Sequence, residues 1–140
     1  MQDFEYLEPE ELVLKLEDIE NRKKTIIVDV REDDFVGGYV KGALHIPSYR
    51  LQSNILDLIQ KTENAKEIIF YCSLSQKRGP AGARLFLKTL QQIKEKRNMQ
   101  KNSGSLKVYV LKGGFTEWQK KYGKNEKLTE EYDKNLWEEK

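Results

Sequence analysis

Three short runs of β-branched and aromatic residues constrain the fold of this chain more than any other feature. They lie at 26–30, 68–71 and 106–111. None of them alternates clearly between apolar and polar residues, which is typical of strands buried on both faces of a parallel sheet. Apolar residues recur at helical spacing between these runs, in three groups: Leu12, Leu16 and Ile19; Leu51, Ile55, Leu58 and Ile59; Ala83, Leu87, Leu90 and Ile93. Strands that alternate with helices predict an α/β fold with a mainly parallel sheet.

The length of the chain suits a single domain. We place this domain at 1–140, with a core at about 9–122 and a helical tail at 123–140. The tail is mostly charged, and its apolar residues recur at roughly helical intervals. They are Leu128, Tyr132, Leu136 and Trp137. We therefore expect a C-terminal helix docked on the core by these residues, with a partner-binding tail as the alternative.

Composition excludes several classes of protein. The chain has one cysteine, so it forms no intramolecular disulfide and no Cys-rich zinc site. Its net charge of +2 is too small to indicate a nucleic-acid partner. No apolar run approaches the length of a membrane span, and the N-terminus is acidic, unlike a signal peptide. We expect no membrane partner, no metal or organic cofactor, and a reducing compartment, cytoplasmic or nuclear.

The segment from Tyr71 to Pro80 carries the chemistry. A buried strand ends at Cys72, five residues follow, and then come Arg78, a glycine and a proline that opens a helix. A strand-to-helix loop of this kind wraps backbone N–H groups around an anion, and an arginine grips two oxygens of a tetrahedral oxyanion. Such an electropositive loop favours the thiolate form of a cysteine, which is a nucleophile. The alternative is a buried structural cysteine.

We therefore predict that Cys72 and Arg78 are catalytic. The residues between and beside them are predicted to bind the substrate, with the Ser75 hydroxyl bonded to the Cys72 sulfur; they are Ser73, Leu74, Ser75, Gln76, Lys77 and Gly79. Asp29 is a possible general acid, against the alternative of a structural salt bridge with an arginine. His45, the one histidine, is expected to make a structural hydrogen bond, and Asp33 and Asp34 to cap a turn or helix.

The loop resembles that of the cell-division-cycle dual-specificity phosphatases of the twenty-five type and of the related eukaryotic arsenate reductases, both built on the rhodanese fold. Other segments of rhodanese domains are similar to 27–31, to 35–47 and to 111–115 with the following Trp118. The resemblance covers about 9–122 and implies a three-layer α/β domain with a five-stranded, mostly parallel sheet.

This sequence also departs from the cell-cycle enzymes. Tyr71 stands where they have histidine, and Lys77 stands where they have an acidic residue. These differences, together with the length of the chain, point to the small stand-alone members of the group. Sulfurtransferases of this fold usually have a loop one residue shorter, so the spacing from Cys72 to Arg78 suits a larger oxyanion than sulfane sulfur.

Four functions follow from these residues and this resemblance. The first is a cysteine-dependent phosphatase that acts on phosphotyrosine or phosphothreonine/serine of a phosphoprotein through a thiophosphate intermediate. The second is an arsenate reductase that uses the same loop, with glutathione and glutaredoxin as the thiol partners that the chain itself lacks. Less favoured are a non-catalytic phosphate-binding scaffold and a thiosulfate sulfurtransferase.

Overall fold

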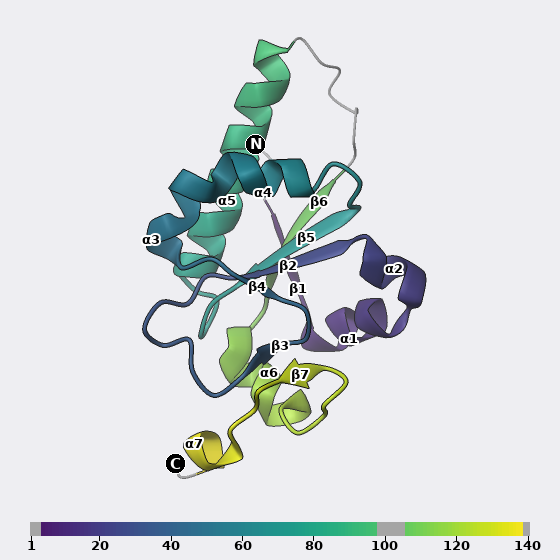
Figure 1. Cartoon of the computed structure of the whole chain (residues 1–140), viewed down its shortest axis with the longest axis vertical. Coiled ribbons are helices and arrows are strands. Elements are labelled where there is room, and N and C mark those ends of the chain that lie inside the picture. Colours follow the sequence, from purple (N-terminus) through teal and green to yellow (C-terminus); the bar gives the residue numbers. More distant parts are fainter. Residues whose placement is uncertain (1–3, 98–105, 139–140) are drawn as a thin grey trace.

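The structure, a computed structural model, describes residues 4–97 and 106–138. The polar segment 94–105 predicts a helix end followed by a surface loop, and residues 98–105 of this segment lie outside the described residues. Figure 1 labels the elements in chain order, and their bounds are β1 (Glu5–Leu7), α1 (Pro9–Glu17), α2 (Ile19–Lys23), β2 (Thr25–Asp29), β3 (Tyr39–Val40), β4 (Leu44–His45), α3 (Ser48–Leu51), the 3-10 turn η1 (Gln52–Asn54), α4 (Ile55–Lys61), β5 (Glu67–Tyr71), α5 (Arg78–Lys96), β6 (Lys107–Leu111), α6 (Gly114–Tyr122), β7 (Thr129–Glu130) and α7 (Lys134–Glu138).

The main sheet has five strands in the order β1-β6-β5-β2-β4, and every neighbouring pair in it is parallel. This confirms the predicted α/β fold with a five-stranded, mostly parallel sheet. The three apolar runs form the three central strands β2, β5 and β6. The two edge strands are only two or three residues long, which is too short to carry a recognisable hydrophobic period.

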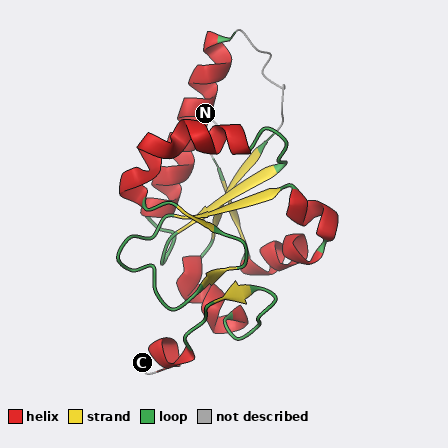
Figure 2. Ribbon diagram, in the orientation of Figure 1, coloured by secondary structure: helices red, strands yellow, loops and turns green. Residues whose placement is uncertain are grey.

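Helices cover both faces of the sheet, with α3, α4 and α5 on one side and α1, α2 and α6 on the other (Figures 1 and 2). The central strands supply both cores in alternation. Val28 and Phe70 belong to the cluster that includes Phe86 of α5. Ile27 and Ile69 belong to the opposite cluster, which includes Trp118 of α6 and Leu12 of α1. Both faces of each strand are therefore apolar, as expected for a sheet between two helical layers.

The first helical segment differs from its predicted pattern. Helix α1 ends at Glu17, and Ile19 is 70% exposed instead of sharing the buried face of Leu12 and Leu16. Asp18 has an extended backbone, and its carboxylate accepts hydrogen bonds from the N–H groups of the next turn. Asp18 thus acts as an N-cap that starts a new helix, α2, in a different direction. The prediction for Ile19 was wrong for this reason.

The C-terminal tail is not the single helix predicted for it. Strand β7 pairs antiparallel with β3, placing Tyr39 opposite Glu130, and the short helix α7 follows (Figure 1). Leu128 is 3% exposed, and the Trp137 indole N–H donates to the Gly37 carbonyl at 3.0 Å. Predicted apolar residues therefore do contact the core. The β3–β7 pairing displaces the helix because it satisfies backbone groups of the glycine-rich segment after β2.

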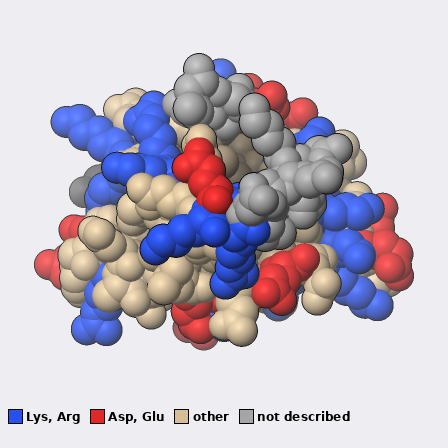
Figure 3. Space-filling view, turned by 90° about the horizontal axis from the view of Figure 1, so that it is seen from above, with Lys and Arg blue, Asp and Glu red and all other residues tan. Residues whose placement is uncertain are grey.

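The surface carries charges of both signs. On the face seen in Figure 3, lysine and arginine side chains lie among aspartate and glutamate side chains, in keeping with the small net charge. None of the helices in the described ranges 4–97 and 106–138 has the length and apolar character that a membrane span requires.

Candidate active site

The loop from Cys72 to Lys77 joins the carboxyl end of β5 to the first turn of α5. In open α/β sheets ligands bind outside the carboxyl ends of the strands, and this loop lies at that edge. It lines an open cavity of ≈ 250 Å³. The lining residues are all among the predicted site residues: Cys72, Ser73, Leu74, Gln76, Lys77 and Arg78. The other two predicted loop residues, Ser75 and Gly79, lie behind this surface and contact the sulfur.

Backbone amides surround the Cys72 sulfur, which belongs to a side chain only 3% exposed. The N–H groups of Ser75 and Gly79 donate to Sγ at 3.2 and 3.3 Å. Gly79 is the second residue of α5, so one donor comes from a helix N-terminus. Both amide dipoles stabilise negative charge on the sulfur, which is what a nucleophilic thiolate requires.

Ser75 contacts Cys72 differently from the prediction. Its hydroxyl oxygen accepts a hydrogen bond from the Cys72 backbone N–H at 3.4 Å, and the bond to the sulfur comes from the Ser75 backbone. Ser75 has a positive φ of 57°, which turns its N–H back toward the sulfur. Ser75 has two possible donors to the sulfur, its hydroxyl and its backbone N–H. The conformation of the loop, which the sequence does not reveal, selects the backbone N–H.

Helix α6 fixes the start of the loop. The N–H groups of Phe115 and Thr116 donate to the carbonyls of Cys72 and Ser73, both at 3.0 Å. Gly114 makes this contact possible, because a Cβ there would lie 2.4 Å from each of these two carbonyl oxygens and its φ is +60°. Gly114 is therefore needed to seat α6 against the loop from Cys72 to Lys77.

Arg78 forms a two-point ion pair with Asp34, a residue that the sequence suggested only as a capping group. Nη1 donates to Oδ1 at 2.9 Å and Nη2 donates to Oδ2 at 2.6 Å. The Ser73 hydroxyl also donates to Asp34 Oδ2. Within its own turn, Asp34 Oδ1 accepts the Glu32 N–H at 2.8 Å. Its contacts with Ser73 and Arg78 are the part that sequence reasoning missed.

The ion pair shifts the titration of both partners. Hydrogen bonding from Arg78 holds the pKa of Asp34 well below its usual range, and the hydrogen bond from Ser73 adds to this. Hydrogen bonding to Asp34 likewise raises the pKa of Arg78, and the charges of Asp34 and Cys72 contribute in the same direction. Asp34 is therefore a carboxylate at neutral pH and holds no proton to give to a leaving group.

Asp29 is completely buried and pairs with Arg31. The Arg31 side-chain nitrogens Nε and Nη2 donate to the Asp29 carboxylate at 2.7–3.1 Å. The Arg31 backbone N–H donates to Asp29 Oδ1 at 3.0 Å. Asp29 does not line the cavity. This geometry matches the salt-bridge alternative for Asp29, and we do not assign it the role of general acid.

His45 lies at the edge of the sheet and away from the sulfur cavity. One ring nitrogen, Nε2, lies 2.7 Å from the Arg31 carbonyl, and the ring stacks on Phe35 at 3.7 Å between centroids. These contacts agree with the structural hydrogen bond expected for this histidine. They also fix the turn after β2, which carries Asp34.

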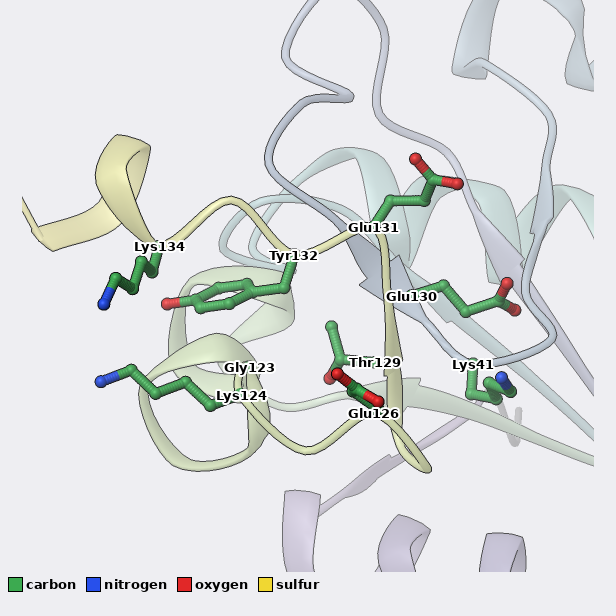
Figure 4. A pocket seen from close by; sticks show the side chains of 9 residues that line it. All are labelled: Lys41, Gly123, Lys124, Glu126, Thr129, Glu130, Glu131, Tyr132 and Lys134. Carbon is green, nitrogen blue, oxygen red and sulfur yellow. The ribbon is translucent and has the colours of Figure 1, made fainter.

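A second cavity, of ≈ 520 Å³, lies between the tail and the end of α6. Figure 4 shows lysine and glutamate side chains around it, with the Tyr132 ring beside Gly123 and Lys124. The ring packs closely on this turn, since a Cβ on Gly123 would lie 2.5 Å from a Tyr132 ring carbon. The Tyr132 hydroxyl donates to Gln119 Oε1 at 2.7 Å. This cavity has no cysteine or arginine in its lining and belongs to the docking of the tail.

Comparisons with known proteins place this geometry in a family. Residues 9–121 match the profile of the rhodanese-like domain. The chain is 33% identical over 145 residues to the CDC25-like phosphatase YCH1 of Saccharomyces cerevisiae, covering 94% of this chain and 93% of that protein. It is 28% identical over 115 residues to arsenate reductase 2.2 of Oryza sativa subsp. japonica, covering 81% of each. The solved structure of Ygr203w, described as a yeast protein tyrosine phosphatase of the rhodanese family, superimposes with a TM-score of 0.79 at 31% identity, covering 98% of this chain and 99% of that one.

Proposed function

The chain belongs to the family of rhodanese-like domains, and from this premise we propose that it is a cysteine-dependent phosphatase that acts on phosphotyrosine or phosphothreonine/serine. One observation carries the proposal: a cysteine sulfur held by two backbone amides lies in the same cavity as an arginine. This is the arrangement that transfer of a tetrahedral phosphoryl group requires. We further propose that residues 1–140 act as one domain.

The proposed reaction has two steps. The Cys72 thiolate attacks phosphorus, an S–P bond forms, and the P–O bond to the substrate hydroxyl breaks. Arg78 binds the equatorial oxygens while charge redistributes in the transition state. Water then attacks the phosphocysteine, which releases inorganic phosphate and restores the thiolate.

The proton for the leaving group comes with the substrate in this proposal. Among the residues that line the cavity none is a carboxylic acid or a histidine. Asp34 is ionised and Asp29 is enclosed by Arg31. A phosphate monoester has its second pKa near 6, so its monoanion carries one proton that can pass to the departing oxygen. An aryl phosphate, whose leaving group needs little protonation, is therefore the substrate of choice for a first assay.

The size of the cavity sets the class of substrate. A volume of ≈ 250 Å³ is at or below the lower limit of pockets that enclose a whole small molecule, so it admits a phosphoryl group and the first atoms of its side chain. The remainder of such a substrate stays outside. A phosphorylated protein side chain fits this description, since the protein part needs no enclosure.

Arsenate reduction is the second candidate, and the similarity to a rice arsenate reductase favours it. Arsenate is close to phosphate in size and charge, so Cys72 can form an S–As bond as water leaves. Reduction of As(V) to As(III) takes two electrons, which two thiols supply when they become a disulfide. The chain has one cysteine. Glutathione and glutaredoxin are therefore the proposed thiol donors.

A side-by-side assay of wild type and Cys72→Ser tests both candidates. Wild-type hydrolysis of p-nitrophenyl phosphate that disappears in the variant is the expected result. Hydrolysis that survives in Cys72→Ser contradicts the phosphatase mechanism. Arsenite formation in the presence of glutathione and glutaredoxin, with no aryl phosphate hydrolysis, would replace the first candidate with the second.

A further inference from the structure

Asp34 makes the most direct contact with the catalytic arginine, and the proposed reaction assigns it no step. It lies on the turn after β2, 44 residues before Arg78 in the sequence. The carboxylate faces the end of the guanidinium, with one oxygen on each terminal nitrogen, at 2.9 and 2.6 Å. A contact made at two points fixes both the position and the plane of the arginine.

Asp34 is itself held from three directions. The Glu32 N–H donates to Oδ1 at 2.8 Å, and the Ser73 hydroxyl donates to Oδ2. Arg31 Nη1 lies 3.5 Å from the Asp34 carbonyl and 3.4 Å from that of Val36, so the turn is tied to the buried ion pair. The carboxylate is thus a rigid support, even though the side chains of Asp34 and Arg78 are 38% and 32% exposed.

The stereochemistry of the guanidinium leaves room for a substrate. An end-on pair uses one N–H of each terminal nitrogen, whereas the side edge keeps the Nε–H and a second Nη N–H. Those two donors form a second fork of the kind that binds two oxygens of an oxyanion. A lysine held by the same carboxylate would offer no such second fork.

We propose that Asp34 is a positioning residue that holds Arg78 by its end-on edge and so presents the Nε edge to the oxyanion. This rests on the proposed function, since the oxyanion is the phosphoryl group transferred to Cys72. Ser73 then has a second task, to orient the Asp34 carboxylate from within the catalytic loop.

The negative charge of Asp34 means that a positioning role and a role in binding the substrate predict different effects. A carboxylate beside Arg78 lowers the attraction of the site for an anion, so it does not strengthen binding of phosphate. Asp34 instead fixes the position of the Arg78 guanidinium, and this position stabilises the equatorial oxygens in the transition state. Loss of Asp34 should therefore reduce kcat while leaving the affinity for inorganic phosphate unchanged or slightly higher.

The test compares Asp34→Asn with wild type in kcat for p-nitrophenyl phosphate and in the inhibition constant of inorganic phosphate. We expect kcat to fall about 10- to 100-fold, the scale of a misplaced catalytic group. The inhibition constant of inorganic phosphate should stay within about threefold of the wild-type value or decrease slightly, because the anion loses no direct contact and a neighbouring negative charge is removed. Asp33→Asn is the matched control, since it removes the same charge from the neighbouring exposed residue. It should leave both constants close to wild type.

Two more variants keep the test decisive. Asp34→Glu restores a carboxylate and should recover part of the lost kcat. Ser73→Ala leaves the ion pair but removes one hydrogen bond to it, and kcat should fall about three- to tenfold. If Asp34→Asn does not fold, as judged by thermal unfolding, Ser73→Ala decides the question.

Three outcomes overturn the inference. An Asp34→Asn kcat close to or above that of wild type would show that Asp34 only competes with the substrate. A loss of affinity for inorganic phosphate as large as the loss of kcat would show that Asp34 contributes to binding and not to positioning. Wild type that neither turns over nor binds phosphate would overturn the proposed function and this inference together, so the two failures are distinguishable.

Discussion

Two aspartate–arginine pairs each include one residue of the turn after β2, Arg31 in one and Asp34 in the other, and they differ in burial. Asp29 and Arg31 are 0% and 1% exposed, and Arg31 also donates to the Gly38 carbonyl at 2.7 Å and lies over the Phe115 ring at 4.5 Å. Asp34 and Arg78 are about a third exposed, and Arg78 lines the sulfur cavity. Both pairs join the segment after β2 to the rest of the fold.

The difference shows how one residue type serves two purposes. Arg31 has its carboxylate and carbonyl acceptors inside the protein, so it has no accessible edge for a ligand. Arg78 binds Asp34 with one edge and faces the cavity. A buried ion pair with this many partners holds the shape of the turn, whereas a partly exposed pair at a sheet edge leaves part of the arginine accessible to a substrate.

Removing Arg31 should have the largest effect on stability. In Arg31→Met the Asp29 carboxylate stays buried without its partner, and the free energy of unfolding should fall by about 3–5 kcal/mol. Urea denaturation followed by circular dichroism measures this. The double variant Asp29→Asn/Arg31→Met should recover part of the loss. A change in Arg31→Met below about 1 kcal/mol would mean that the pair is not the support that its burial indicates.

Replacing Arg78 should reduce activity strongly and stability only slightly, the reverse of the emphasis expected for Arg31. Arg78→Lys keeps a positive charge but loses the planar fork, so kcat/KM for p-nitrophenyl phosphate should fall about 10²- to 10³-fold. The free energy of unfolding should change by less than about 1 kcal/mol, because the pair with Asp34 is partly exposed. Arg50→Lys, an exposed arginine outside the cavity, is the control. Activity retained in Arg78→Lys would remove Arg78 from the mechanism.

A substitution in the C-terminal tail should have a smaller effect on the turn after β2, which Trp137 contacts. Trp137→Ala removes the indole hydrogen bond to the Gly37 carbonyl and the contact with Phe115, whose ring centroid lies 5.7 Å away. We expect a loss of about 1–2 kcal/mol in the free energy of unfolding and a fall of about two- to fivefold in kcat, since the turn that holds Asp34 loosens. Trp137→Phe keeps the ring packing and should retain most of both. An Ala variant with unchanged kcat would uncouple the tail from the site.

The pH dependence of stability should show the smallest effect. The native pKa of Asp34 is lowered, so its ion pair contributes stability above the unfolded pKa of about 3.9, and this contribution is lost as the pH falls toward the native pKa. Solvent screening limits the contribution to less than about 1 kcal/mol. The difference in unfolding free energy between wild type and Asp34→Asn should therefore narrow below about pH 4. A difference that widens on acidification has the wrong sign for this account.

Much of the fold could be predicted from the sequence because its signals are local. The apolar runs at 26–30, 68–71 and 106–111 became β2, β5 and β6, and the spacing of Ala83, Leu87 and Leu90 predicted α5. Strands β3 and β7 have two residues each, which is too short to show a period. Their pairing depends on contacts between segments far apart in the chain, such as Tyr39 with Glu130, and β7 stands where a helix was predicted for the tail.

The candidate site was predictable in part for the same reason. Cys72 and Arg78 are found from a contiguous motif, and the loop brings them to one cavity. Asp34 stands in the run Glu32-Asp33-Asp34, where three similar acids give no sign of which one reaches the arginine. The turn after β2 makes that choice, because β2 and β5 are neighbours and end at the same edge of the sheet. The expected pairing of these two parallel strands could have predicted the contact, because an acidic residue just after β2 can reach the loop that follows β5.

The most direct test of the whole account is to capture the intermediate. Wild-type protein mixed with an aryl phosphate and quenched in milliseconds should carry one phosphoryl group, located on Cys72 by mass spectrometry of the digested protein. The adduct should build up more weakly in Arg78→Lys and be absent in Cys72→Ser. Steady hydrolysis with no phosphoryl group on Cys72, continuing in Cys72→Ser, would contradict the claim that this sulfur is the nucleophile.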